Sequence, residues 1–334
     1  MTSALSDDPI LVSELRALAE RGRHRELLKR LATVAPELVA RRTAFALLAA
    51  EAHGRLGAHA EAERWATVAL LSAQARGERH AELRARNHQG AIALERGDVG
   101  VANLHFAAGL ELARALGDHA AAARCLNNLG IIANLQGDPR AALASYQLAL
   151  AAYQQAGLVR GMAETQHNIG ISWRDLRVYA RALDAAEEAV RLALQVGDEA
   201  LAALAVAGRA ELHLIQGDAE LAGVELARAG AAFERLQHPG GLAEVWRLQA
   251  GVARSHGDQE GAVALLRRAA ALLVKGPGSA PTLAEIERDL GAALVALGDE
   301  AGARAARERA AELYRRLGAA RAADAVGALA LGAS

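Results

Sequence analysis

Cysteine, lysine and aromatic residues are scarce in this sequence of 334 residues. Cysteine occurs once, lysine twice, and Phe, Trp and Tyr together make up 3%. A single cysteine can form no disulfide within the chain, so we expect Cys125 to be a small packing residue rather than a nucleophile. So few aromatic side chains disfavour recognition of single-stranded RNA, which stacks its bases on aromatic rings.

The sequence also lacks an excess of either charge and a long apolar run. It carries 38 basic and 39 acidic residues, a formal net charge of −1, which disfavours nucleic acids and membrane surfaces as partners. No uncharged apolar stretch approaches the roughly 18 residues of a spanning helix. The opening MTSALSDDP has no basic region followed by an apolar run, so we expect no signal peptide and a cytoplasmic protein.

What the sequence does contain is a helical hairpin, seen most clearly at residues 124–157. Its first half has one apolar stripe at helical spacing, formed by Leu126, Leu129, Gly130 and Ala133. Gly137 is placed to end this helix and Asp138 to cap the next. The inward face of the second helix carries Ala142, Tyr146 and Ala149. Small residues on both helices predict that the two backbones approach closely.

Three series of small residues repeat this hairpin with a step of 40 residues, except for a last step of 41. The first series is Ala50, Gly90, Gly130, Gly170, Ala210, Ala250 and Gly291. The second is Ala62, Ala102, Ala142, Ala182, Ala222, Ala262 and Ala303. The third is Ala69, Gly109, Ala149, Ala189, Ala229, Ala269 and Ala310. Three series in phase predict a solenoid of helical hairpins.

The pattern Leu-x-x-Leu-Gly-x-x-Ala…Ala-x-x-x-Tyr-x-x-Ala at residues 126–149 resembles the tetratricopeptide repeat, and the resemblance covers about residues 36–318. The period is 40 rather than about 34, aliphatic residues replace the early Trp, and the closing proline is absent. Such long-helix repeats are similar to those of peptide-binding bacterial regulators and LGN/Pins-type scaffolds. We therefore expect an all-α, right-handed superhelical solenoid of TPR-like helical hairpins.

We expect three parts along the chain. Residues 1–35 form a degenerate capping hairpin, residues 36–318 form seven repeats, and residues 319–334 form a capping helix and tail. At the fourth hairpin Arg177 stands where glycine is expected, which predicts a turn of different shape. Residues 275–281, KGPGSAP, form either an inter-repeat loop or a hinge.

The search for catalytic motifs returns little. The sequence has no His-Glu-x-x-His, Gly-x-Ser-x-Gly, P-loop or dinucleotide fingerprint. No two histidines lie four residues apart on one helix face, so no metal and no cofactor are expected. Ser255, His256 and Asp258 are too close in sequence to face one another as a triad must. An enzyme built on this scaffold would instead reveal itself by an unexplained cluster of perturbed titratable groups.

The first helices of the hairpins should line the concave surface, where equivalent positions form lanes. One lane reads Ala44, Arg84, Arg124, Glu164, Leu204, Glu244 and Glu285, and the next reads Leu47, Asn87, Asn127, His167, Ala207, Arg247 and Arg288. Asparagine is a poor helix-interior residue, and its amide can bind an extended peptide backbone. Arginine adds a fork for carboxylates. The predicted peptide-binding groove is Arg84, Asn87, His88, Arg124, Asn127, Asn128, Ile131, Asn134, His167, Asn168, Ile171 and Arg174.

We therefore expect a non-enzymatic scaffold that binds a protein or peptide segment, with acidic or carboxylate groups among the options for the ligand. The alternative is a peptide-sensing regulator whose ligand switches binding of a second protein. A third interpretation makes the polar residues solvated or hydrogen-bonded to neighbouring helices. Under the groove hypothesis Arg124, Asn128, Asn168 and Arg174 face solvent and contribute little to folding.

Close approach of the helices also gives an expectation about Gly130. A leucine there should overpack the contact, whereas alanine should be tolerated far better than leucine, because Gly→Ala is intrinsically favourable inside a helix.

Overall fold

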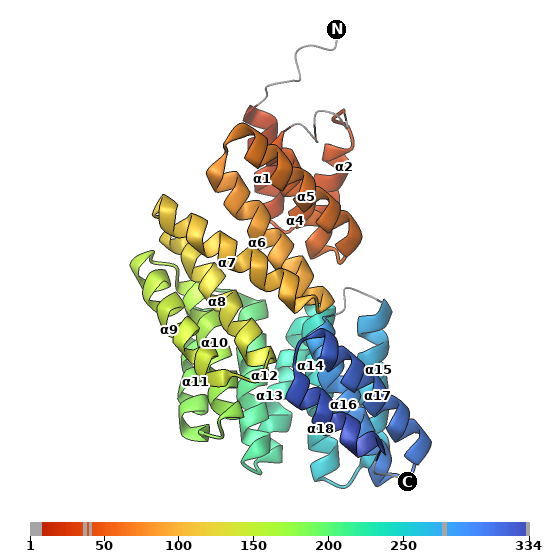
Figure 1. The fold of residues 1–334 in the computed structure, drawn as a ribbon. Helices are drawn as coiled ribbons and strands as arrows, with labels where there is room; N and C mark the ends of the chain where they lie inside the picture. The colour runs from red at the N-terminus through yellow and green to blue at the C-terminus, as the bar shows by residue number, and fades with distance from the viewer. Residues whose placement is uncertain (1–8, 36–38, 40–41, 276–278, 332–334) are drawn as a thin grey trace. The chain divides into compact units, whose positions relative to one another are not determined.

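The computed structural model describes residues 9–35, 39, 42–275 and 279–331. Within these residues every regular element is an α-helix and no strand occurs (Figure 1). The chain is therefore all-α and built of TPR-like helical hairpins. Several sequence-based expectations concern positions outside the described residues, namely the start of the first repeat at residue 36, most of the 275–281 segment and the tail after residue 331.

The chain divides into two compact units. The first consists of residues 1–94 and 101–121, and the second of residues 95–100 and 122–334. The early helices are α1 (Pro9–Glu20), α2 (His24–Leu31), α4 (Thr43–Arg55), α5 (His59–Arg76), α6 (Arg79–Arg96) and α7 (Val99–Leu116). They are followed by α8 (His119–Leu135), α9 (Pro139–Gln155), α10 (Val159–Asp175), α11 (Tyr179–Gln195), α12 (Glu199–Ile215) and α13 (Ala219–Arg235). The last are α14 (Pro239–Ser255), α15 (Gln259–Lys275), α16 (Ala280–Ala296), α17 (Glu300–Arg316) and α18 (Ala320–Leu331).

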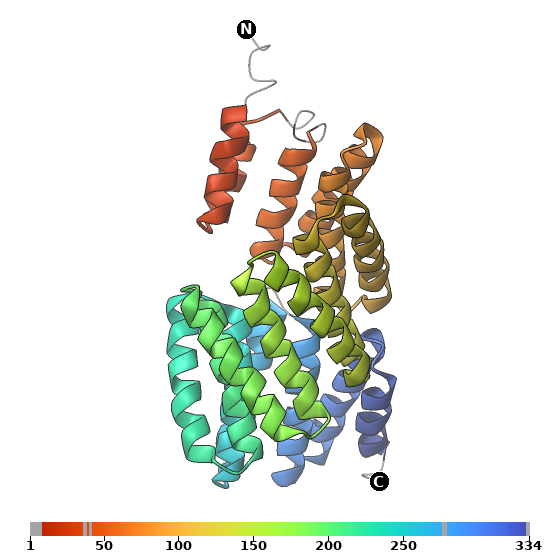
Figure 2. The same ribbon diagram turned by 90° about the vertical axis from the view of Figure 1, so that its left-hand side faces the viewer.

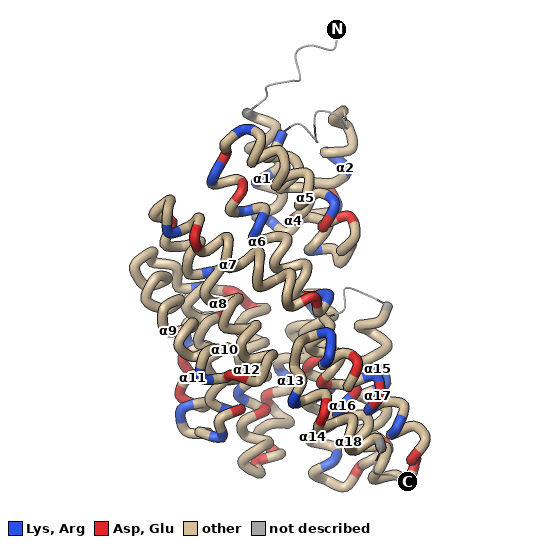
Figure 3. Tube along the Cα trace, in the orientation of Figure 1, with Lys and Arg blue, Asp and Glu red and all other residues tan. Residues whose placement is uncertain are grey.

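In the second unit, Figures 1 and 2 both show α10 to α17 as antiparallel pairs that stand side by side. Basic and acidic residues are interspersed along these helices (Figure 3). The boundaries proposed between cap, repeats and C-terminal helix stay a prediction.

The turns use the Gly-Asp chemistry expected from the sequence. After α8, Gly137 has φ +78° and its N–H donates to the carbonyl of Asn134 at 2.9 Å. The Asp138 carboxylate then accepts a hydrogen bond from the N–H of Ala141 at 3.0 Å and caps α9. The same side-chain cap recurs at Asp118, Asp198, Asp218, Asp258 and Asp299. The structural reading of these pairs is confirmed.

The expectation of a different turn after α10 is wrong. Arg177 has φ +60° and donates its N–H to the carbonyl of Arg174 at 2.8 Å, while Val178 donates to Trp173 at 2.9 Å. These bonds match those of the glycine turns, so the backbone is held left-handed although arginine has a Cβ that disfavours it. Packing of the two flanking helices determines the turn, and the residue conforms.

The three series of small residues form the contact line of each hairpin. Every member of all three series is buried. Members of the second series, including Ala142 and Ala182, are 0% exposed. The predicted close approach of the paired helices is therefore confirmed.

Aromatic rings fill the space next to several glycines. A Cβ added at Gly130 would lie 2.4 Å from Cε1 of Tyr146, and one at Gly90 would lie 2.7 Å from the ring of Phe106. Both rings are fully buried. The tyrosine ring occupies the space that a methyl group at position 130 would need, so even alanine requires the ring to shift, and the expected ranking of alanine over leucine stays a prediction.

We predict opposite effects for two matched glycine substitutions. Gly130→Ala should lower the free energy of unfolding by about 1–3 kcal/mol, because the buried ring must shift. Gly170→Ala should be neutral or stabilise by up to about 1 kcal/mol, because its nearest neighbours are backbone atoms at ordinary contact distance, the carbonyl of Ala182 at 3.4 Å among them. Urea denaturation measures both. Equal stabilities for the two variants would contradict the ring-contact explanation.

Candidate functional site

A cavity of about 800 Å³ lies within the second unit. Its walls come mainly from the first helices of successive hairpins, α8, α10, α12, α14 and α16, and from the C-terminal helix α18. The first helix of the α12–α13 hairpin supplies an apolar stretch of wall through Leu204, Ala207 and Gly208. Ala322 and Val326 of α18 also line the cavity. The size and mixed lining are those of a ligand-binding cavity.

On the α8–α10 side, asparagines join neighbouring hairpins. The Asn127 side chain is buried, and its Oδ1 accepts hydrogen bonds from the Thr165 hydroxyl at 3.0 Å and from Nδ2 of Asn168 at 3.2 Å. The Ser172 hydroxyl donates to Oδ1 of Asn134 at 3.0 Å. These oxygens hold α8 against α10. Nδ2 of Asn134 remains as a donor at the cavity wall.

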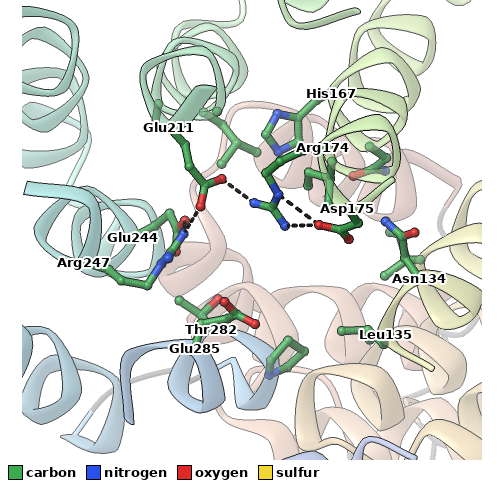
Figure 4. A pocket seen from close by; sticks show the side chains of 18 of the residues that line it. Asn134, Leu135, His167, Arg174, Asp175, Glu211, Glu244, Arg247, Thr282 and Glu285 are labelled. Atoms are coloured by element: carbon green, nitrogen blue, oxygen red, sulfur yellow. Dashed lines mark hydrogen bonds and ion pairs between the residues drawn. The ribbon is translucent and has the colours of Figure 1, made fainter. Parts of the chain in front are cut away.

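An ion-pair network crosses the cavity wall and begins on α10 (Figure 4). The Arg174 guanidinium donates to Oδ1 of Asp175 at 2.8 Å and also to the Glu211 carboxylate of α12. The other oxygen of Glu211 accepts from Arg247 of α14 at 2.9 Å. Burial alone would raise the pKa of Glu211, but the two flanking guanidiniums outweigh burial and hold this pKa at about 2. Glu211 is therefore ionised and doubly paired.

The network continues onto α16 and α17. Arg247 donates to Oδ2 of Asp289 at 3.1 Å, and the other oxygen of that carboxylate accepts from Arg288 at 2.8 Å. Arg288 also pairs with Glu285 at 2.6 Å, and the Tyr314 hydroxyl donates to Glu285 at 2.8 Å. Arg247 is the most buried member, with 6% of its side chain exposed. Ion pairs thus run without a break from α10 to α16, and the Tyr314 hydroxyl extends the network to α17 by a hydrogen bond.

His167 borders the cavity beside this network. It points into the same space as Arg174 (Figure 4), and no hydrogen bond of its imidazole is found among the described residues. A Cβ at Gly208 would lie 3.0 Å from the imidazole, so this glycine makes room for the ring. Burial, followed by repulsion from Arg174, lowers the pKa of His167 to about 4. The neutral ring offers one donor and one acceptor.

The predicted groove residues fall into three groups. Six line the cavity, namely Ile131, Asn134, His167, Asn168, Ile171 and Arg174. Arg124, Asn127 and Asn128 are on α8 but are not part of its lining. Arg84, Asn87 and His88 are on α6, in the first unit. Whether any of them binds a ligand stays a prediction.

The expectation that four of these residues face solvent freely needs correction. Arg124 is exposed and Asn128 is half-buried. Asn168, however, donates to the buried oxygen of Asn127. Arg174 already pairs with two carboxylates, so its fork is not open to a ligand carboxylate. The third interpretation, hydrogen bonding to neighbouring helices, therefore describes Asn127, Asn168 and Ser172 with its partner Asn134.

Sequence reasoning missed the acidic and C-terminal half of the cavity. Its unpredicted lining includes Glu211, Glu244, Arg247, Glu285, Arg288, Tyr314 and Val326. The signal was present, because Glu244 and Glu285 share a lane with Arg124, while Arg247 and Arg288 share one with His167. The predicted groove followed the repeats rich in asparagine and therefore left out the later members of the same lanes.

The structure also bears on the possible triad, on metal-binding groups and on membrane-spanning helices. Ser255 donates to the carbonyl of Val252 at 2.7 Å, and Asp258 caps α15 through Gly261, so each is engaged in a helix end. The described residues hold no group of three or more His, Cys, Asp or Glu side chains suited to a metal ion. Among the helices that the structure describes, none is long and apolar enough to cross a bilayer.

The family model described as "Tetratricopeptide repeat" matches residues 105–155. Residues 105–155 therefore contain a tetratricopeptide repeat. No curated protein matches the sequence.

Solved structures of tetratricopeptide-type folds resemble the whole chain. A Rap protein complexed with Competence and Sporulation Factor is 16% identical with a TM-score of 0.62, and the match covers 97% of this chain and 96% of that one. NprR in complex with its cognate peptide NprX is 16% identical with a TM-score of 0.60, covering 86% and 80%. The apo quorum sensor NprR from B. thuringiensis is 12% identical with a TM-score of 0.55, covering 97% of both chains. Identities this low show a shared fold.

Neighbouring asparagines on α8 should differ in their contribution to the stability of the tetratricopeptide array. Asn127→Ala should lower the free energy of unfolding by about 1–3 kcal/mol, because it removes a buried side chain that joins α8 to α10 and leaves the Asn168 amide without its acceptor, although the Thr165 hydroxyl keeps the carbonyl of Gly161. Asn128→Ala should change it by no more than about 0.5 kcal/mol. Urea denaturation of both variants tests this, and a large loss for Asn128→Ala alone would reverse the assignment.

His167 should make stability depend on pH. Its folded pKa of about 4 lies below its ordinary 6.5, so the unfolded chain binds more protons between these values. The part of the folding stability that depends on this neutral imidazole is fully present above about pH 6.5 and is lost as the pH falls toward about 4. When the pH is lowered from about 7.5 to about 5, the free energy of unfolding of the His167→Gln variant should therefore fall by about 1–2 kcal/mol less than that of the native chain.

Urea denaturation at both pH values measures this difference. His256→Gln, which changes an exposed histidine of the same unit, serves as the control. Identical pH dependence of the His167→Gln variant and the native chain would show that the imidazole is solvated and protonates freely.

Proposed function

We propose that this chain is a non-enzymatic binding module that holds a peptide or protein segment in the cavity of its second unit. The observation that carries the proposal is the cavity wall itself. Successive first helices present an apolar stretch around Leu204, a free amide donor on Asn134 and a neutral imidazole on His167. An extended peptide needs both apolar contacts and donors and acceptors for its backbone.

The structural comparisons support the same ligand class. Two of the similar structures are complexes, one of a Rap protein with Competence and Sporulation Factor and one of NprR with its cognate peptide. Their likeness to this chain concerns the fold, and the fold supplies the helix faces that line the cavity.

Binding rather than catalysis is proposed because the perturbed titratable groups have an explanation. Within the described cavity lining, the acids with shifted pKa values, Glu211 and Asp175, are hydrogen-bonded to guanidiniums. No serine, cysteine or threonine nucleophile is paired there with a base in the way nucleophilic catalysis requires. We further propose a cytoplasmic protein that binds neither nucleic acid nor membrane.

A second candidate is a regulator in which the peptide switches binding of another protein. The observation that favours it is the position of α18, which lines the cavity with Val326 and packs on α17. A ligand in the cavity would therefore touch the last helix. Small-angle scattering with and without a bound peptide tests this candidate, and identical curves would argue for a passive scaffold.

Filling the cavity should abolish peptide binding. Short random peptides displayed on phage are selected on the native chain, and the enriched sequences are synthesised. Ile171 lines the cavity and is only partly buried, so Ile171→Trp adds bulk to the open space. Isothermal titration should give an affinity at least about tenfold weaker for this variant, equivalent to about 1.4 kcal/mol.

Leu148→Trp is the matched control, because Leu148 is 57% exposed on the second helix of its hairpin. It should bind the peptides as the native chain does. Equal loss in both variants, or none in either, would place binding outside the cavity. Failure to enrich any peptide would reject a short-peptide ligand.

A further inference from the structure

The ion-pair network at the cavity contains more acids than bases. Its three guanidiniums belong to Arg174, Arg247 and Arg288, and its five carboxylates belong to Asp175, Glu211, Glu244, Glu285 and Asp289. Three positive against five negative charges leave two negative charges. The remaining charged pair of the lining, Arg160 with Glu164, is balanced within itself, and Arg160 also pairs with Asp198.

The two ends of this network are carboxylates that belong to different helices. Glu211, Glu244 and Asp289 each lie against Arg247, the deepest guanidinium of the network. Asp175 and Glu285 lie at its two ends, on α10 and α16, and both line the cavity (Figure 4). Each has a single guanidinium partner, Arg174 and Arg288 respectively.

Asp175 responds electrostatically to Glu285. Burial raises the pKa of Asp175 above its ordinary value, the contact with Arg174 lowers it, and repulsion from Glu285 and Glu211 adds to the rise, so that the net shift is upward. A carboxyl that touches a guanidinium normally has a lowered pKa. Burial is the largest cause of this upward shift, and the smaller repulsion from Glu285 places the two carboxylates within electrostatic reach of each other.

Asp175 also has an unused acceptor. Both hydrogen bonds from Arg174 end on its Oδ1, and no partner of its Oδ2 is found among the described residues. Figure 4 shows the Asn134 side chain on the same side of the cavity as Asp175. An incoming N–H donor would find Oδ2 open, next to an amide that can engage a neighbouring peptide group.

We propose that the cavity selects a cationic ligand group, a guanidinium or ammonium of the bound peptide, and holds it between Asp175 of α10 and Glu285 of α16. The proposal rests on the proposed function, since it specifies the chemistry of the peptide that the cavity binds. A cation placed there neutralises the surplus charge and donates to the open oxygen of Asp175. The field of a concave site with a net charge also favours entry of the opposite charge.

A carboxylate ligand, which the sequence favoured, fits this end of the cavity poorly. To reach Arg174 it would have to displace Asp175 or Glu211, and each displaced acid would lose its partner. It would also add a third negative charge to the surplus. Charge selectivity thus follows from how the guanidiniums are already occupied.

The test uses the same phage-displayed random peptides, selected on the native chain. Enriched peptides should carry arginine or lysine at one fixed position, or depend on a free N-terminal amine. Replacing that arginine by citrulline, which is similar in shape but neutral, or that lysine by norleucine, should weaken binding about tenfold or more. Acetylating the N-terminus distinguishes the terminal ammonium from a side chain.

Variants of the protein locate the effect. In Asp175→Asn combined with Glu285→Gln, the preference for arginine over citrulline, or for lysine over norleucine, should fall to about twofold or less, while binding of the neutral peptide persists. The control Asp184→Asn removes an exposed carboxylate of α11 and should keep the full preference. Circular dichroism and urea denaturation establish that each variant is folded.

The outcomes separate this inference from the proposed function. Peptides whose binding is lost in Ile171→Trp but which carry no required cation, or bind better with an acid, would leave cavity binding in place and overturn the cation site. A cation preference that survives in the double variant would also overturn it. No enrichment at all would reject both.

Discussion

Contact between helix backbones at alanine and glycine positions governs this molecule. The three buried series bring each pair of helices together, and a large aromatic ring fills the space beside some of the small residues, as Tyr146 does at Gly130. The same exchange of volume joins successive hairpins. Where α9 meets α10, Gly161 leaves room for Tyr153, and where α13 meets α14, Gly241 leaves room for Phe233. Where α11 meets α12, Leu201 and Ala193 belong to one buried cluster. Small residues opposite large ones let successive hairpins pack closely although their side chains differ.

Regular stacking decides which groups can meet at the cavity. Side chains on equivalent turns of α10, α12, α14 and α16 come within hydrogen-bond distance across a separation of about one repeat, as Arg247 does with Glu211 and Asp289. The core therefore positions the charges without contributing any itself. A burial pattern made of small residues also leaves the opposite faces of the first helices free to vary, and that variation gives the cavity its chemistry.

The repeating features of the fold could be read from the sequence because they depend on local chemistry. Small residues at a fixed step, glycines with positive φ and aspartate caps each act within one hairpin. Arg177 shows the limit, since a tertiary constraint holds a non-glycine residue in the glycine conformation. Gly130 shows another, because the sequence does not reveal that Tyr146 already fills the space of a methyl group.

The site was harder to predict than the fold. Six predicted residues line the cavity. Asn127, however, is a buried acceptor between hairpins, and Arg174 pairs with one acid of its own helix α10 and one of α12. Lanes identify which positions are equivalent. They do not give the rotamers that decide whether an arginine turns toward a ligand or toward a carboxylate one repeat away. The contribution of α18 was missed because it follows the repeats and belongs to no lane.

The position of Arg247 has a consequence for how the protein comes apart. Arrays of repeats commonly lose their terminal units one at a time, since each unit contacts only its neighbours. Here one deeply buried guanidinium is shared by carboxylates from three consecutive hairpins. Detaching any of the three leaves charge buried without its partner, which is strongly unfavourable. The stretch from α12 to α17 is thereby joined into a single cooperative block, and fraying from the C-terminal end halts where the shared charge begins.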